Sequence, residues 1–208
     1  MANDLPQSIK VDIWSDFVSP FCFIASLRLE KLAQGDNLDP IWVAFMVRPH
    51  GAPPLPDDKR AEAERERAEA AEILRREFGL EMNPGPIGID TYDAHLIMAH
   101  ATRTGKGPVL LQALMRAYWL EARSIDDLAV IKEVAVSAGL EPDEVLYALE
   151  DPKNAHHVER GMEIGVGHGI HSVPSHIFAS KYLVTGSADY AALQQTVNTL
   201  KEELRKAG

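Results

Sequence analysis

The chain has 208 residues, and its 21 Lys and Arg against 31 Asp and Glu give a formal net charge of −10. This balance argues against non-specific binding to nucleic acid or anionic membranes, because both need a basic surface. No apolar run approaches the roughly 20 residues that cross a bilayer, and Met1–Ser8 lacks the features of a signal peptide. A single cysteine, Cys22, excludes an intramolecular disulfide and a zinc site with several thiolates. We therefore expect a globular, cytoplasmic protein.

The first fifty residues predict a β–α–β unit. Lys10–Phe17 alternates apolar and polar residues, which is typical of a strand. Ser19 is a favoured N-cap and Pro20 suits the first helical position, so we expect a helix from Ser19 to Gly35. Pro40–Val47 predicts a second strand. Because a helix separates the two strands, we expect them to pair in parallel.

The middle of the chain predicts helices. After a Pro-rich linker, Asp57–Phe78 is rich in Ala, Glu and Arg, which favours a solvated helix face over a binding site. Met82–Gly88 predicts a loop, either over a groove or as a plain connector. Apolar residues at helical spacing, such as Tyr118 and Trp119, indicate a bundle core. The further helices are expected over Thr91–Arg103, Pro108–Glu121, Asp126–Ala138 and Pro142–Leu149.

The C-terminal third returns to strands. Asn154–His168 is predicted to be helical, and Pro174–Phe178 and Tyr182–Val184 predict an antiparallel hairpin. Ala188–Lys206 predicts a final amphipathic helix. The fold class is therefore α/β, in the order β–α–β, a helical block, then α–β–β–α.

Two segments have the residue types for chemistry. Ser19 ends a predicted strand and begins a helix, whose free N–H groups and positive dipole end stabilise a nearby anion such as a thiolate. Cys22 lies in the same first turn, although a lone cysteine more often only packs. In the second segment, Pro174 opens a strand, where either a cis or a trans peptide is possible.

Together and in this order, the segments resemble the DsbA-like, FrnE-type thioredoxin-fold proteins. Trp14–Cys22 (W-S-D-F-V-S-P-F-C) resembles their W-S-D-F-V-C-P-W-C, and Gly169–Ser175 resembles their G-I-x-G-V-P segment with its cis-proline. Tyr182–Ser187 is similar to their closing Y-x-x-S-G-A, and Ala117–Glu121 to the A-Y-F-x-E of their inserted helical domain. The resemblance covers Lys10–Leu200. It implies a thioredoxin fold over residues 10–50 and 153–206 with an inserted α-helical domain over residues 57–150.

The chain departs from this family at its nucleophile, because Ser19 replaces the first cysteine. A serine cannot form a mixed disulfide, and one thiol cannot cycle between dithiol and disulfide. Ser19–Cys22 (S-P-F-C) also resembles the S-P-Y-S of kappa-class glutathione transferases and 2-hydroxychromene-2-carboxylate isomerases. This resemblance implies that glutathione is the cofactor and that Ser19 is the catalytic residue that holds its sulfur. The residues it implies around the cofactor are Ser19, Pro20, Phe21, Val173, Pro174 and Ser175.

Several roles stay open from the sequence. Cys22 is either a shielded packing residue or a catalytic thiol that forms a mixed disulfide. Asp16 is a buried base or a capping acceptor, and Arg48 binds a carboxylate or makes a surface salt bridge. His171 or His176 has the chemistry of an acid–base group. We expect no metal site, because the histidine spacing alone does not bring ligands together.

Three functions follow from these patterns. The first is a glutathione-using isomerase, transferase or reductase for a small organic substrate, with Phe21, Tyr92 and Trp119 shaping the cleft under the helical block. The second is a monothiol oxidoreductase that works through Cys22. The third is a non-catalytic peptide-binding or chaperone module. We favour the first, and the resemblance also makes a homodimer an expectation.

Overall fold

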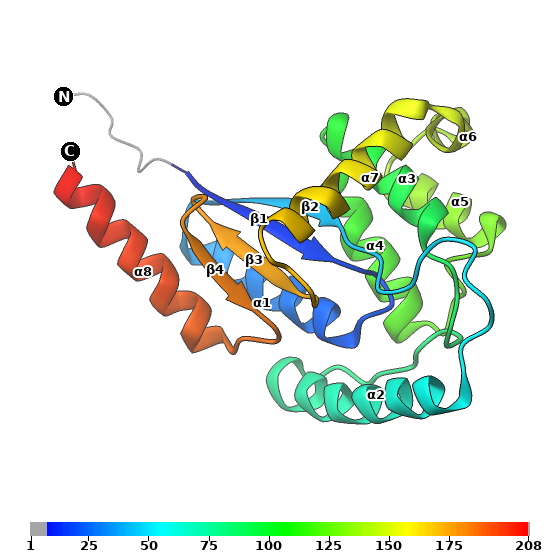
Figure 1. The fold of residues 1–208 in the computed structure, drawn as a ribbon, viewed down its shortest axis with the longest axis horizontal. Helices are drawn as coiled ribbons and strands as arrows, with labels where there is room; N and C mark the ends of the chain where they lie inside the picture. Colours follow the sequence, from blue (N-terminus) through cyan, green and yellow to red (C-terminus); the bar gives the residue numbers. More distant parts are fainter. Residues whose placement is uncertain (1–7, 208) are drawn as a thin grey trace.

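The structure is a computed structural model that describes residues 8–207. The segment examined above for a signal peptide, apart from Ser8, lies outside the described residues. Within residues 8–207, every helix is too short or too polar to span a bilayer. The elements in chain order (Figure 1) are β1 (Ile9–Ser15), α1 (Pro20–Gly35), β2 (Leu38–Ala44), α2 (Asp57–Phe78), α3 (Tyr92–Arg103), α4 (Gly107–Leu120), α5 (Leu128–Ser137), α6 (Pro142–Glu150), α7 (Pro152–Gly167), β3 (Ser175–Phe178), β4 (Tyr182–Thr185) and α8 (Tyr190–Ala207).

Over the described part of the chain, four strands form one mixed sheet in the order β2-β1-β3-β4. β1 pairs with β2 in parallel, and β3 pairs with both β1 and β4 in antiparallel register. Ile13 lies beside Trp42 on one side and beside His176 on the other, so β1 is central. The parallel β–α–β unit and the C-terminal hairpin predicted from the sequence are confirmed, and so is the thioredoxin-type α/β architecture.

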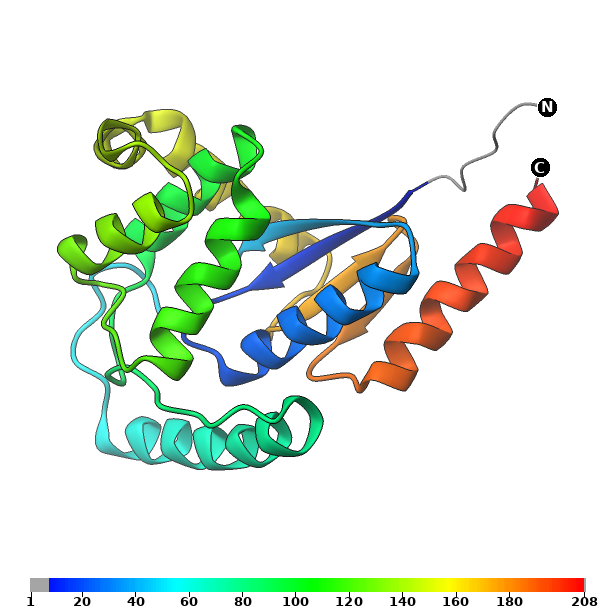
Figure 2. The same cartoon turned by 180° about the vertical axis from the view of Figure 1, so that it is seen from behind.

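Helices cover both faces of the sheet. Figure 1 shows α7 in front of the sheet, and the reverse view in Figure 2 shows α1 and α8 across the opposite face. On the α7 face, Trp14, Ile170 and Ile177 form a small core, and Trp14 Nε1 donates a hydrogen bond to Gly161 O at 2.9 Å. Gly165 passes close to Trp14, because a Cβ at that position would lie 2.7 Å from the indole ring. The main apolar core is much larger and lies on the other face of the sheet, beneath α1.

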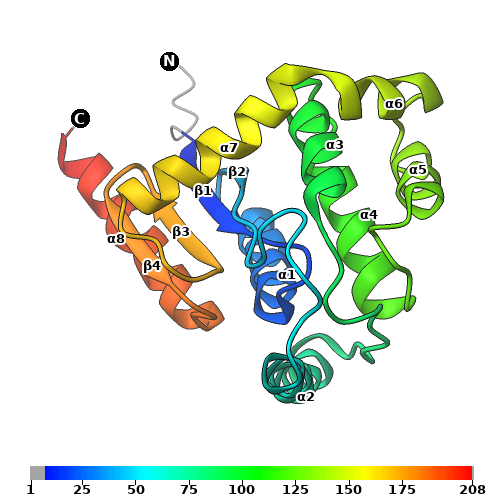
Figure 3. The ribbon, with the colours of Figure 1, turned by 45° about the vertical axis from the view of Figure 1, so that its right-hand side comes forward.

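The helical block lies beside this sheet. Helices α3 to α6 gather at one end of the molecule, and α2 lies apart from them along the lower edge (Figure 3). The main apolar core joins the two parts, since it includes Phe17 and Phe23 together with Trp119 of α4 and Leu193 of α8. The division into a thioredoxin-like domain and an inserted helical domain stays a prediction.

Element boundaries differ from the predicted ones mainly at the strands. β1 ends at Ser15 instead of Phe17, and β2 covers Leu38–Ala44 instead of Pro40–Val47. Pro40 lies inside β2 because this strand is at the edge of the sheet, where a missing N–H costs no ladder hydrogen bond. The segment after Ala44 therefore leaves the sheet early and is free to line the cleft described next.

Candidate active site

Ser19 begins α1 as the sequence predicts. Its backbone is extended (φ −88°, ψ 119°), Pro20 is the first helical residue, and the Ser19 hydroxyl accepts a hydrogen bond from Cys22 N at 3.4 Å. Ser19 is half-buried and lines a cleft of about 520 Å³ together with Pro20 and Phe21. The hydroxyl is thus placed at a helix N-terminus and beside open space.

The segment before β3 forms another wall of this cleft. His171, Ser172 and Val173 line it, whereas Pro174 and Ser175 are buried and do not. The Val173–Pro174 peptide bond is cis. Ser175 Oγ donates to Ser172 O at 2.8 Å, which fixes the turn. Within residues 8–207, the Val173 backbone N–H and C=O make no hydrogen bond, so both groups are free to pair with a ligand.

Helix α2 supplies a third wall. Lys59, Glu62, Ala63, Glu66 and Arg67 all line the cleft, so one face of the charged run is part of the site. Lys59, Glu62 and Glu66 are exposed, as predicted for a solvated helix face, and they also border the cleft. The low apolar content of α2 gave no sign in the sequence of which side faces the cleft. Lys59 and Glu62 form an ion pair at 2.7 Å.

Arg67 is held in the cleft by aromatic side chains. Its Nη2 donates to Tyr118 Oη at 2.7 Å, and the guanidinium lies 5.7 Å from the Tyr118 ring and 5.3 Å from the Trp119 ring. Tyr118 in turn donates to Pro86 O at 2.7 Å. Burial raises the pKa of Tyr118 to about 12, in spite of the adjacent Arg67 charge. The phenol therefore stays neutral at physiological pH.

The aromatic residues expected in the cleft are only partly correct. Phe21 and Tyr118 line it, but Trp119 is fully buried and donates its Nε1–H to Phe17 O at 2.8 Å. Tyr92 instead stacks on His50 at 4.3 Å between ring centroids and does not line the cleft. Tyr118 of α4 therefore lines the cleft, whereas Trp119 of the same helix stabilises the segment that leads into α1.

Cys22 points into the protein core. Its side chain is fully buried, and it does not line the cleft. This burial raises the pKa of the Cys22 thiol to about 11, although the Ser15 and Ser19 hydroxyls favour the thiolate. At neutral pH the sulfur is therefore protonated and shielded, which argues against a catalytic role.

Asp16 and Arg48 have structural partners. Asp16 is fully buried, and its carboxylate accepts hydrogen bonds from Val47 N at 2.8 Å and His95 Nε2 at 3.3 Å. It lies behind the cleft, so it ties the end of β1 to the segment after β2. Arg48 lines the cleft, and its guanidinium donates to Gly88 O at 2.7 Å, Ala52 O at 2.6 Å and also Pro53 O. Among the described residues Arg48 makes no salt bridge, and its contact with a ligand carboxylate stays a prediction.

The two candidate acid–base histidines lie in different environments. His171 is exposed at the cleft, whereas His176 is buried in β3 and does not reach it. Only His171 is therefore placed to exchange a proton with a bound ligand. In residues 8–207, no cluster of three or more His, Cys, Asp or Glu side chains is arranged to hold a metal ion.

A second cavity, of about 450 Å³, lies between α1, β2 and α4. Its walls are mainly apolar, with Trp42, Met98 and Val109 among them, and none of the site residues predicted from the sequence lines it. The cleft at Ser19 is thus where the predicted residues meet.

Comparison with known proteins agrees with this architecture. The sequence matches the DSBA-like thioredoxin domain over residues 10–198. The chain belongs to the DSBA-like thioredoxin domain family. Within this family it combines the expected fold with a serine at the cleft and a buried cysteine.

Three solved structures illustrate the range of proteins with a similar fold. A probable DsbA oxidoreductase from Streptomyces coelicolor is 26% identical, with a TM-score of 0.77 over 92% of this chain and 89% of the other. A 2-hydroxychromene-2-carboxylate isomerase is 16% identical, with a TM-score of 0.76 over 96% and 99% of the two chains. The cytosolic disulfide reductase DsbM from Pseudomonas aeruginosa, solved with GSH, is 16% identical, with a TM-score of 0.65 over 95% and 98%. The last two likenesses show the shared fold.

Proposed function

We propose that this DSBA-like protein is a glutathione-dependent enzyme that acts on a small organic substrate, with Ser19 orienting the glutathione thiolate. The observation that carries the proposal is that Ser19, at the N-terminus of α1, lines the same cleft as the free backbone of Val173. The isomerase, transferase and reductase reactions are all compatible with this arrangement.

Ser19 has the chemistry for such a role. Its oxygen already accepts the Cys22 N–H, so its own hydroxyl proton is available as a donor. Because Cys22 stays protonated, its sulfur is a weak acceptor and competes poorly for that proton. A thiolate bound at Ser19 would gain a charge-assisted hydrogen bond and the favourable field of the α1 dipole.

Val173 supports the same proposal. An extended peptide pairs with a free backbone N–H and C=O as an added strand does, and glutathione has a peptide backbone of this kind. DsbM, which has the same fold, has been solved with GSH. The buried Cys22 supports the proposal further, because the folded protein offers no exposed thiol in residues 8–207 and the proposed nucleophilic sulfur is that of the ligand. The proposal thus places the protein in the glutathione-rich cytoplasm.

Isothermal titration with reduced glutathione tests the proposal. We expect binding to the wild type and about tenfold weaker binding to Ser19→Ala, because one charge-assisted hydrogen bond is lost. Ser137→Ala, which removes an exposed hydroxyl on α5, is the matched control and should bind as the wild type does. Conjugation of glutathione to an electrophilic substrate should fall in the same order. Equal affinity and activity in Ser19→Ala, or no heat with the wild type, contradicts the proposal.

A second candidate function is that of a peptide-binding module. The free backbone N–H and C=O of Val173 could pair with an extended peptide even without a role for Ser19. In that case an extended peptide without a thiol should bind as tightly as glutathione, and Ser19→Ala should bind this peptide with unchanged affinity.

The monothiol alternative predicts a glutathione adduct on Cys22 after treatment with oxidised glutathione, which intact-mass spectrometry would detect. The burial of Cys22 leads us to expect no adduct on the folded protein.

A further inference from the structure

The charges in the cleft differ from those of the chain as a whole. The chain has 21 basic and 31 acidic residues, but the cleft lining has three cations, Arg48, Lys59 and Arg67, and two carboxylates, Glu62 and Glu66. Lys59 and Glu62 neutralise each other through their ion pair. The cleft is therefore a locally basic place in an acidic protein, which favours anionic ligands.

Arg67 stands out because all of its partners are uncharged. The tyrosine hydroxyl accepts one of its N–H groups, and the rings of Tyr118 and Trp119 lie against its guanidinium. No carboxylate of residues 8–207 forms an ion pair with it. A guanidinium has five N–H donors, so most of its donors are available to a ligand in the cleft.

The aromatic partners also fix where the Arg67 charge lies. Tyr118 is held by its hydrogen bond to Pro86 O, and Trp119 by its hydrogen bond to Phe17 O. With one N–H bound to the Tyr118 hydroxyl and two fixed rings nearby, the guanidinium keeps its place in the cleft, and its planar fork suits a bidentate contact with a carboxylate. Tyr118 does not neutralise this charge, because burial keeps its phenol protonated.

Apolar groups complete the wall beside this cation. Phe21, Ile87 and Ile89 line the same cleft, and Gly88 between the two isoleucines is held by Arg48. A ligand that fits has an apolar body for these side chains and a terminal anion for Arg67.

We propose that Arg67 is the specificity-determining residue of this cleft and that the substrate is a small organic molecule with a carboxylate. This inference about Arg67 rests on the proposed function for one point, which is that the ligand sulfur lies at Ser19. The carboxylate then extends from the sulfur towards α2, where it would receive two N–H groups of Arg67.

The test compares two glutathione conjugates that differ only in one carboxylate, S-(4-carboxybenzyl)glutathione and S-benzylglutathione, by isothermal titration. We expect the wild type to bind the carboxylate conjugate about tenfold more tightly, which is the size of one charge-assisted interaction. Arg67→Gln should bind both conjugates equally. Arg65→Gln, which makes the same charge change on an exposed residue of α2 outside the cleft, should keep the preference.

The outcomes separate this inference from the proposed function. If the wild type binds both conjugates equally, glutathione binding stands and the role of Arg67 is overturned, whether or not the variants fold. If neither conjugate binds, titration with reduced glutathione decides the glutathione proposal, because the conjugates have a thioether in place of the thiolate, and 2-naphthoate against 2-naphthamide then tests Arg67 without a thiol. A preference for the naphthoate that Arg67→Gln loses supports the inference, and the absence of that preference in the wild type overturns it.

Discussion

At the scale of single residues, His176 shows how burial controls charge in this protein. The imidazole is enclosed in β3, where Nδ1 lies 3.4 Å from Val184 O and Nε2 has no hydrogen-bond partner in residues 8–207. Burial lowers the pKa of His176 to about 4. The side chain is therefore neutral throughout the range in which cells operate.

This environment predicts a pH-dependent stability. The unfolded chain binds a proton at His176 near pH 6.5, whereas the folded protein binds it only near pH 4. Stability is therefore complete above about pH 6.5 and falls by about 3 kcal/mol as the pH drops to 4. Urea unfolding between pH 4 and 7.5 should show this slope in the wild type and in His171→Gln, an exposed histidine. His176→Gln should show a clearly shallower slope, which leaves the part due to His157, whose pKa burial also lowers, and an unchanged slope in that variant would contradict the role given to His176.

The residues of the site were not equally predictable from the sequence. Ser19 was predictable because a Ser-Pro pair before an apolar run is a local helix-start signal, and the cap is indeed there. Arg67 was not predictable, because its role depends on contacts with Tyr118, 51 residues away. The burial of Cys22 also depends on the core around α1, and a short motif does not contain that information.

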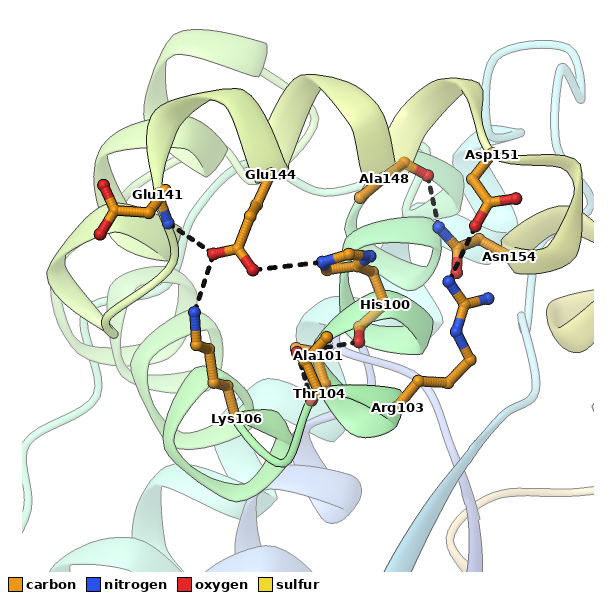
Figure 4. A network of polar contacts seen from close by, with 10 residues as sticks. All are labelled: His100, Ala101, Arg103, Thr104, Lys106, Glu141, Glu144, Ala148, Asp151 and Asn154. Carbon is orange, nitrogen blue, oxygen red and sulfur yellow. Dashed lines mark hydrogen bonds and ion pairs between the residues drawn. The ribbon is translucent and has the colours of Figure 1, made fainter.

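At the scale of the elements, a polar network joins α3, α6 and α7 with the residue before α4 (Figure 4). Glu144 of α6 accepts hydrogen bonds from Lys106 Nζ at 2.8 Å and from Glu141 N at 2.7 Å, and its other oxygen lies 3.7 Å from His100 Nε2. Arg103 of α3 pairs with Asp151, the N-cap of α7, at 2.8 Å. The network thus fixes the start of α6 and α7 against α3 and the residue before α4.

The pKa of Glu144 sets the pH range over which this network stabilises the fold. The hydrogen bonds from Lys106 and from Glu141 N lower the pKa of Glu144 to about 2, from a usual value of 4.5. Its contribution to stability is present above about pH 4.5 and is lost as the pH falls towards 2. Glu144→Gln keeps an oxygen for the cap but loses the charge, so thermal melts at pH 7 should show a midpoint a few degrees lower. The difference should shrink by pH 3, and Glu150→Gln on the same helix should melt as the wild type does.

Helix and strand types were predicted well from local patterns, whereas their surroundings were not. The period of apolar residues identifies α3 and α4 as core helices, and both are mostly buried. The same reasoning does not locate the side of α2 that lines the cleft, because only Ala70 and Leu74 of this helix are buried and the lining residues are mostly charged. The spacing of apolar residues shows which face of a helix packs on a core. A helix face that lines a polar cleft has no such spacing and is not recognised in this way.

At the scale of the whole molecule, one buried arginine connects distant parts of the chain. Arg28 of α1 is 3% exposed, and it binds both carboxylate oxygens of Glu77 in α2, at 3.0 and 2.8 Å. It also donates to Ser187 O at 3.1 Å and Ala188 O at 2.9 Å, just before α8. A single guanidinium therefore joins the first helix, the charged helix α2 and the last helix.

Removing this guanidinium should destabilise the fold. Arg28→Met leaves the Glu77 carboxylate and two backbone carbonyls without their donor, which should cost about 3 kcal/mol in urea unfolding. Arg76→Met is a matched control, because Arg76 contacts the same Glu77 carboxylate at 3.4 Å from an exposed position. We expect that variant to lie within about 0.5 kcal/mol of the wild type. Equal losses in the two variants would contradict the role given to Arg28.

The order of the elements along the chain was sufficient to predict the parallel β1–β2 pair and the β3–β4 hairpin, because these pairings follow from the connections, whereas the antiparallel β1–β3 pair was implied only by the family resemblance. It was not sufficient for the cleft, which is assembled from residues 18–21, 47–67, 87–89, 118 and 171–173. Only the first and last of these segments have a motif that a reader of the sequence would notice.

The enclosed, protonated sulfur of Cys22 has a practical consequence for experiments. Maleimide reagents attack accessible thiolates, so the native protein should leave them unreacted, with no need to remove its own cysteine. A cysteine engineered at Arg65, which is exposed and does not line the cleft, could then be coupled to a dye without labelling the site.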